Sequence, residues 1–172
     1  NLVIVESPAK AKTIGKYLGK DYGVRSCGGH ICDLPEMEKR IVAGIKNGNE
    51  PTFEIIADKK ELVAKLKDEA SASVHVWLAT DEDREGEAIA WHLKVALGLD
   101  DEKYSRITFT EITKPAILQA MKKPRKINDD LVNAWKARRV LDYLVGYDVS
   151  QLLWKKVQKG LSAGRVQSPA LR

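Results

Sequence analysis

Two apolar segments of this chain run directly into acidic side chains, the residue type best suited to bind a cation or move a proton. The N-terminal run LVIV ends at Glu6, and residues 74–79 lead into a stretch in which five of seven residues are acidic. In an extended chain Asp81 and Asp83 point the same way, and Glu85, at the start of the next helix, can turn back toward them. Carboxylates this close repel one another unless a cation lies among them, and oxygen-only ligands favour Mg²⁺. We therefore predict a Mg²⁺ site formed by these four carboxylates.

Helix capping is the simpler interpretation of the same acidic stretch, because acids before a helix stabilise its N-terminal dipole. Capping needs only one or two of the five acids. Lys10 follows Glu6 by four residues and could either meet a phosphate at the same place or pair with Glu6. His30 follows Gly28-Gly29, where the main chain can approach a ligand closely, although a lone histidine is more often structural.

The distribution of charge points to a polyanionic partner. The formal net charge is +5, and residues 131–172 hold eight Lys and Arg against two Asp, which leaves the rest of the chain near neutral. Aromatic side chains lie among these basic ones, a pattern that suits single-stranded nucleic acid through base stacking and phosphate neutralisation. A surface of solvated lysines with tryptophans in the core is the alternative. A small-residue loop around Arg165 could also hold a phosphate through its N–H groups. The candidate contacts before this loop are Trp135, Arg138, Arg139, Asp142, Tyr147 and Trp154.

The elements that must position these residues alternate between strand and helix up to about residue 123, which predicts an α/β domain with a mainly parallel sheet. Parallel strands end on one edge of their sheet, and ligands bind at that edge. After Pro124 the pattern predicts only helix. The expected strands are 2–5, 53–56, 74–79 and 106–110. The expected helices are 8–18, 85–97, 115–122, 129–145 and 149–157, together with one that follows a capping box at Asp58 and Glu61. Asn128 is expected to cap the helix 129–145.

Composition excludes several classes of protein. With 172 residues, 44% of them hydrophobic, the chain can bury one or two cores and is not a disordered tail. No apolar run reaches the roughly 20 residues of a membrane span, and we expect no membrane association. Cys27 and Cys32 are too few for a disulfide framework, which fits a reducing cytosol.

Six segments together resemble the N-terminal part of type IA DNA topoisomerases, most closely the bacterial members. They cover most of the chain in the order that the family has. They are VIVESPAKAKTIGKYLG (3–19), GGHICDLP (28–35), LATDEDREGEAIAWHL (78–93), FTEIT (109–113), NAWKARRVLDYLVGY (133–147) and LLWKKVQKGLSAGRVQSPALR (152–172). The resemblance implies a Rossmann-like Toprim domain over 1–125, with helices on both faces of its sheet. It also implies that 126–172 is a helical DNA-binding segment that begins the next domain.

The family cleaves one DNA strand through a tyrosine, holds a 5′-phosphotyrosyl link, passes another strand and reseals the first without ATP. By resemblance, Glu6 transfers a proton and ligates the metal, Lys10 steadies the scissile phosphate, and Asp81, Asp83 and Glu85 place Mg²⁺. Positions at or near bound DNA in the family match His30, Arg138, Arg139, Asp142, Tyr147, Trp154, Ser162, Ala163, Gly164, Arg165, Val166 and Gln167. The expected partner is therefore DNA, mainly its single-stranded segments.

The family's nucleophilic tyrosine has no counterpart motif here, because all five tyrosines fall in other family segments. We expect the chain to be part of a longer polypeptide whose remainder is required for activity, and to be unable to cleave DNA alone. The family's cysteine-rich zinc modules also have no counterpart. The resemblance further implies a monomer in the bacterial cytoplasm, associated with the nucleoid.

Three other readings remain open from the residues alone. A signalling receiver domain also gathers acids around Mg²⁺, but it needs paired acids after the first strand, where this chain has Glu6-Ser7. A non-catalytic DNA-binding module would not need the acidic stretch for resealing. A primase or a Toprim nuclease is the nearest enzymatic alternative, and segment 133–168 favours topoisomerase over both.

Overall fold

The computed structural model describes residues 1–35 and 51–170, which form two compact units. The first unit comprises residues 1–35 and 52–132, and the second is built on residues 133–170. Helix α6 (Asp129–Lys156) begins in the first unit and continues into the second. None of the helices in these described ranges is long and apolar enough to cross a membrane.

A four-stranded parallel sheet forms the centre of the first unit. Its strand order is β2 (Gly23–Ser26), β1 (Leu2–Val5), β5 (Val76–Leu78) and β6 (Tyr104–Arg106). All three pairings are parallel, and the register places Ile4 opposite Leu78. β1 is buried at every position, as expected of a β-branched run with strands on both sides. The α/β class and the mainly parallel sheet predicted from the sequence are therefore confirmed.

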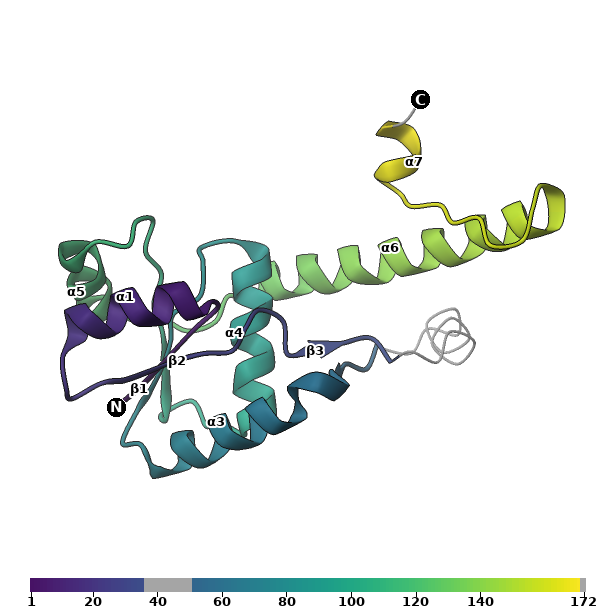
Figure 1. Ribbon diagram of the computed structural model, residues 1–172. Helices are drawn as coiled ribbons and strands as arrows, with labels where there is room; N and C mark the ends of the chain where they lie inside the picture. Colours follow the sequence, from purple (N-terminus) through teal and green to yellow (C-terminus); the bar gives the residue numbers. More distant parts are fainter. Residues whose placement is uncertain (36–50, 171–172) are drawn as a thin grey trace. The chain divides into compact units, whose positions relative to one another are not determined.

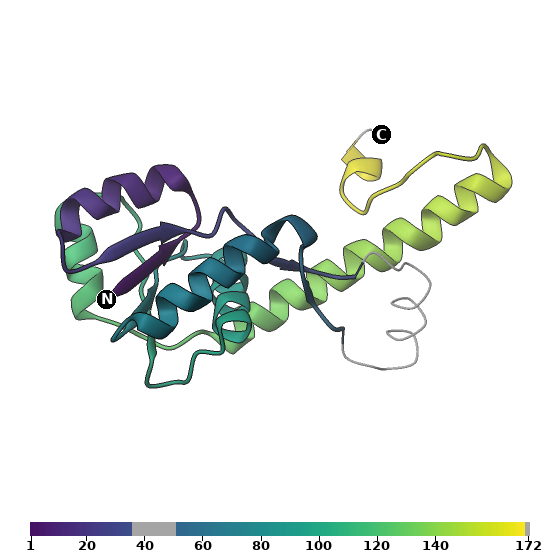
Figure 2. The same cartoon turned by 60° about the horizontal axis from the view of Figure 1, so that its bottom comes forward.

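Helices cover both faces of this sheet (Figure 1 and Figure 2). One face packs against α1 (Pro8–Leu18) and α5 (Lys114–Lys122), around Val3, Val5, Ile14 and Ile117. The other face packs against α3 (Lys60–Ala72) and α4 (Arg84–Leu97), around Leu2, Ile4, Leu66 and Leu93. A separate antiparallel pair joins β3 (Cys32–Asp33) to β4 (Glu54–Ile55).

Helix caps fix where the chain turns from strand to helix beside the sheet. The Ser7 side chain accepts a hydrogen bond from the Lys10 N–H (3.3 Å), and Pro8 occupies the first turn of α1. Gly98 ends α4 in the left-handed conformation (φ 65°), which glycine adopts without steric cost. These starts and stops agree with those predicted from the sequence.

Several predicted boundaries differ from those of the structure. The strands expected over 74–79 and 53–56 are shorter, at Val76–Leu78 and Glu54–Ile55. The capping box at Asp58 and Glu61 does not form, because Ala57–Lys59 is a short 3₁₀ helix and α3 begins after it with no side-chain cap. β6 covers Tyr104–Arg106 and does not extend over the expected range 106–110, and Arg106 also pairs with Arg125 in an isolated bridge. The expected interruption between 145 and 149 is absent, since a single interior glycine, Gly146, costs a helix only about 1 kcal/mol.

In the second unit the chain reverses after α6 and returns along that helix. Gly160 takes a positive φ of 90° at the reversal. The Trp154 indole N–H donates to the Leu161 carbonyl (2.5 Å), and the Ala163 N–H donates to the Ser150 hydroxyl (3.1 Å). One further turn of helix, α7 (Gln167–Ala170), follows. These contacts fasten the returning segment to the second half of α6.

Candidate functional site

Glu6 and Asp81 come together because β1 and β5 are adjacent parallel strands. Both residues follow the carboxyl ends of their strands, and the Ala79 N–H donates to the Ile4 carbonyl (2.9 Å) at that edge. One Glu6 carboxylate oxygen accepts a hydrogen bond from the main-chain N–H of Asp81. Strand pairing therefore brings together two acids that are 75 residues apart in the sequence.

Lys10 lies between these two carboxylates. Because α1 starts directly after Glu6, Lys10 stands one turn into the helix and faces back to the sheet edge. Its Nζ is 3.3 Å from Glu6 Oε2 and 2.5 Å from Asp81 Oδ1. The Lys10 side chain is only 18% exposed and that of Glu6 only 17%, so this ion pair is screened less than one on the surface. This position agrees with both roles considered for Lys10, because its ammonium pairs with Glu6 and also lies at the sheet edge where a phosphate would bind.

The two carboxyl groups differ in proton affinity. Burial raises the pKa of Glu6, and the adjacent Asp81 raises it further, while the Asp81 N–H and the Lys10 ammonium oppose the shift only in part. Burial also raises the pKa of Asp81, but hydrogen bonds from Lys10 and Glu6 and the charge of Arg106 outweigh it, so the net pKa is lowered. Burial lowers the pKa of Lys10, yet its two carboxylate partners produce a net increase. As the pH falls, Glu6 accepts a proton before Asp81, which suits Glu6 to proton transfer.

Asp83 and Glu85 have other partners. Asp83 is the N-cap of α4, and its Oδ1 accepts from the Gly86 N–H (2.7 Å). Glu85 Oε2 lies 3.0 Å from Nε2 of His30. The capping interpretation therefore accounts for Asp83, and the predicted four-carboxylate site remains a prediction. Within residues 1–35 and 51–170, no group of three or more His, Cys, Asp or Glu side chains is arranged to hold a metal ion.

A divalent cation nevertheless fits the Glu6–Asp81 pair. Mg²⁺ keeps several of its waters and is usually held by one or two carboxylates together with substrate phosphates, so a third carboxylate is not essential. Both carboxylates already contact a cation, the ammonium of Lys10. Its donors are all carboxylate oxygens, the type that this metal prefers.

His30 reaches the same edge through a glycine turn. Gly28 and Gly29 have positive φ values of 67° and 87°, which bend the chain immediately after β2. The Gly29 N–H donates to the Glu6 carbonyl (2.9 Å), and the Lys59 ammonium donates to the Gly28 carbonyl (3.0 Å). His30, Glu6 and Asp81 are thus all located at the carboxyl edge of the sheet, which was predicted for Glu6 and Asp81 but not for His30.

Comparison with known proteins identifies the family. Residues 1–112 match the model of the Toprim domain, and residues 126–172 match a family model described as DNA topoisomerase. The structure of full-length topoisomerase I from Thermotoga maritima is similar, with a TM-score of 0.87 and 45% sequence identity over 99% of this chain. The chain belongs to the type IA DNA topoisomerase family. It spans 29% of the length of the Thermotoga chain.

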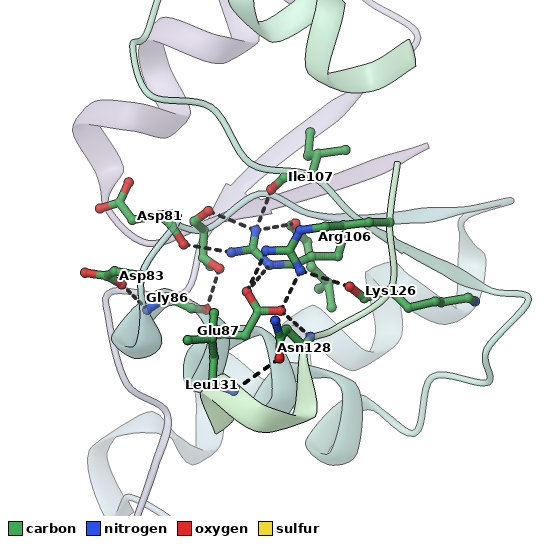
Figure 3. Close-up of polar contacts among 12 residues, drawn as sticks. Asp81, Asp83, Gly86, Glu87, Arg106, Ile107, Lys126, Asn128 and Leu131 are labelled. Atoms are coloured by element: carbon green, nitrogen blue, oxygen red, sulfur yellow. Dashed lines mark hydrogen bonds and ion pairs between the residues drawn. The ribbon is translucent and has the colours of Figure 1, made fainter. Parts of the chain in front are cut away.

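A buried ionic network in this topoisomerase-family chain, centred on Glu87 and Arg106, was not predicted from the sequence (Figure 3). Arg106 and Glu87 are both fully buried, and Arg106 Nε lies 3.2 Å from Glu87 Oε2. Arg125 makes two further bonds to the same carboxylate, at 2.8 and 2.9 Å. Burial tends to raise the pKa of Glu87, but Arg125, the Asn128 N–H and Arg106 reverse this and lower it. The available signal was an arginine directly before the apolar Ile107, at the start of the strand expected over 106–110.

In the second unit the structure brings together three of the predicted DNA-contact residues. Asp142 accepts a bond from Arg165 Nε (2.5 Å), and Arg138 Nε lies 3.6 Å from its other oxygen. The Arg165 bond is the main cause of the lowered pKa of Asp142. Trp154 is half exposed, whereas Trp135 is buried, as its core alternative requires. The charge of Arg139 also contributes to the lowered pKa of Asp142, whereas the role of Tyr147 toward DNA stays a prediction.

Two main-chain N–H groups of the small-residue loop already have hydrogen-bond partners. The Ala163 N–H donates to Ser150 and the Gly164 N–H donates to the Ser168 hydroxyl (3.1 Å each), so two of the N–H groups predicted to hold a phosphate are already used. Arg165 is paired with Asp142. Ser162, Val166 and Gln167 complete the loop, and their role toward DNA stays a prediction.

Proposed function

We propose that this chain supplies the cation site and the proton-transfer carboxylate of a type IA topoisomerase, which relaxes negatively supercoiled DNA by transient cleavage of one strand. The arrangement of Glu6, Lys10 and Asp81 at the carboxyl edge of the sheet carries the proposal. A carboxyl with a raised pKa, a lysine and a carboxylate with a lowered pKa are the parts that reversible phosphoryl transfer requires.

The chemistry assigned to Glu6 is a reversible proton transfer. In cleavage, the oxygen of an ionised tyrosine (tyrosinate) from elsewhere in the polypeptide bonds to phosphorus, the bond from phosphorus to the 3′-oxygen breaks, and protonated Glu6 gives its proton to that oxygen. In resealing, ionised Glu6 takes the proton from the 3′-hydroxyl, whose oxygen attacks phosphorus and releases tyrosinate. The phosphotyrosyl ester retains the free energy of the broken phosphodiester bond, so no ATP is consumed. The raised pKa of Glu6 favours the protonated form that the first step needs.

Lys10 and the acidic residues position the phosphate in this proposal. Lys10 contacts both carboxylates from a partly exposed position, from which its ammonium can approach a phosphate oxygen. Glu6 and Asp81, with Asp83 and Glu85 as further candidates, would hold Mg²⁺. The bound ion would supply electrostatic stabilisation of the phosphate and the 3′-oxygen.

We assign DNA contact to the basic residues of the second unit and to His30. Arg138 and Arg165 flank Asp142, which fixes their guanidinium groups, and exposed Trp154 offers a surface for base stacking. Single-stranded DNA is the preferred partner, and the nucleophilic tyrosine lies outside these residues. A monomeric protein in the bacterial cytoplasm, at the nucleoid, completes the proposal.

Relaxation of negatively supercoiled plasmid by the full-length protein with Mg²⁺ tests the assignment. Glu6→Ala is expected to slow relaxation by about 10²–10⁴-fold, the usual contribution of a general acid or base. Glu61→Ala, at an exposed acid of α3, is the matched control and should leave the rate unchanged. Relaxation at the wild-type rate by Glu6→Ala would contradict the proposed role of Glu6. The 172-residue chain alone should form no covalent adduct with single-stranded DNA, and an adduct would contradict the placement of the nucleophile.

A further inference from the structure

Arg106 is the last residue of β6, and its buried guanidinium points into the turn that carries the acidic stretch (Figure 3). It donates to the carbonyls of Leu78 (3.1 Å), Thr80 (2.9 Å) and Asp81 (2.7 Å). It also donates to the Ile107 carbonyl and, through Nε, to Glu87. Three of its five acceptors are therefore main-chain oxygens on the path from β5 into the acidic stretch.

Both main-chain polar groups of Asp81, its N–H and its carbonyl, are hydrogen-bonded. Its N–H donates to the Glu6 carboxylate, and its carbonyl accepts from Arg106. Gly86, in the first turn of α4, packs directly against this peptide, and a Cβ at that position would lie only 2.8 Å from the Asp81 nitrogen. Thr80 adds a bond from its hydroxyl to the Gly86 carbonyl (2.5 Å). Asp81 is thus placed by its main chain, independently of what its carboxylate binds.

Glu87 balances the charge of Arg106 and extends the network toward α6. Its carboxylate also accepts from Arg125 and from the Asn128 N–H (2.6 Å). The Asn128 side chain in turn caps α6 by accepting from the N–H groups of Asp130 (3.0 Å) and Leu131 (3.2 Å). Arg125 therefore shares the carboxylate with Arg106. The other acceptor of its guanidinium within residues 1–35 and 51–170 is the Lys126 carbonyl, so it does not hold the main chain of Leu78, Thr80 or Asp81.

We propose that Arg106 is a positioning residue for the cation site, which it serves by fixing the main chain of Asp81, with Glu87 as its counter-ion. This inference rests on the proposed function, because it concerns the cation that Glu6 and Asp81 would hold. A residue that merely stabilised the fold would affect folding without changing cation affinity. A positioning residue changes affinity in a protein that remains folded, and outer partners of metal ligands typically affect it by 10–100-fold.

Titration of the full-length protein with Mn²⁺, read by the free-ion electron paramagnetic resonance signal without DNA, tests the proposal. Binding that is lost in Asp81→Asn defines the site. Arg106→Lys keeps the charge but offers fewer donors and no planar fork, so it should weaken this binding by about tenfold or more. Arg125→Lys is the matched control, since it alters the same Glu87 carboxylate without donating to the main chain of Leu78, Thr80 or Asp81, and it should change affinity by less than about threefold. Circular dichroism verifies that each variant is folded.

A second variant covers the case in which Arg106→Lys does not fold. Replacing Arg106 and Glu87 together by Met removes both buried charges, a change that is often neutral for stability. This double variant should also bind Mn²⁺ about tenfold or more weakly. Wild-type affinity in a folded Arg106 variant, or an equal loss in Arg125→Lys, would overturn the positioning role. Absence of an Asp81-dependent Mn²⁺ site in the wild-type protein would instead refute the cation site of the proposed function.

Discussion

Substitution of Glu87 by Gln tests how strongly the buried network stabilises the first unit. Glu87 is fully buried and accepts four hydrogen bonds, one from Arg106, two from Arg125 and one from the Asn128 N–H. Gln has almost the same shape but no charge. Its amide nitrogen would also face N–H donors where the carboxylate offers an acceptor.

The expected loss of stability follows from what the substitution leaves behind. Arg106 has no exposure to solvent, so its charge would remain buried without a counter-ion. Removing one partner of a buried ion pair costs about 3–5 kcal/mol. The Arg125 side chain is 33% exposed and can recover part of its loss by hydration, which argues against a larger value. The loss is a large share of the roughly 5–15 kcal/mol that stabilises a typical domain.

Urea unfolding of the 172-residue chain at neutral pH, followed by far-ultraviolet circular dichroism, measures this loss. With a typical slope of about 2 kcal/mol per molar urea, the midpoint should fall by about 2 M. The lowered pKa of Glu87 means that its contribution is present above the unfolded pKa, near 4.5, and disappears as the pH falls through the lower folded pKa. The difference between wild type and variant should therefore shrink in acid. Glu61→Gln, in an exposed pair, should not move the midpoint. A Glu87→Gln loss below about 1 kcal/mol would refute the reasoning, because it would lie within the range of an ordinary neutral hydrogen bond.

Two further substitutions test the edge of the sheet in metal-free protein. The raised pKa of Glu6 means that the fold favours its protonated form, so its stabilising contribution is complete below the unfolded pKa and is lost as the pH rises through the folded pKa. Glu6→Gln should therefore raise the thermal midpoint at pH 7 and lose this advantage below about pH 4, and a lower midpoint at pH 7 would contradict the assigned direction. Asp83→Ala removes the side-chain bond to the Gly86 N–H and should cost about 1 kcal/mol in urea unfolding, whereas Asp83→Asn, which can still cap, should cost less. Equal losses in the two Asp83 variants would show that the cap bond is not the cause.

The position of the site was predictable from the sequence because it depends on a general rule of sheet topology. Short β-branched runs mark buried parallel strands, and residues at their carboxyl ends must share one edge. That rule brings Glu6 and Asp81 together without any detail of side-chain conformation. The cap at Ser7 was predictable because it depends on a few neighbouring residues, whereas the capping box expected at Asp58 and Glu61 did not form.

Features that depend on distant partners were not predictable. Arg106 was expected to begin a strand over 106–110, yet it is the last residue of β6, and its main chain also pairs with that of Arg125, 19 residues further on. Glu87 looked like one more acid of an exposed helix start, and its burial depends on two arginines outside that helix. The position of Lys10 between two carboxylates likewise needs both strand ends at once.

Lys10 and Arg106, two of the cations that pair with the acidic side chains, differ in their access to solvent. Lys10 is partly exposed and bonds to carboxylate oxygens, so a divalent ion or a phosphate can compete from solution for its contacts. Arg106 is fully buried and bonds mainly to carbonyl oxygens, which no incoming ligand reaches. Exchange at Lys10 therefore leaves the main chain of Asp81 in place. A site organised by Lys10 alone would lose its shape whenever that ammonium was displaced. Buried Arg106 prevents this, because it holds the main chain of Asp81 whether or not Lys10 keeps its contacts.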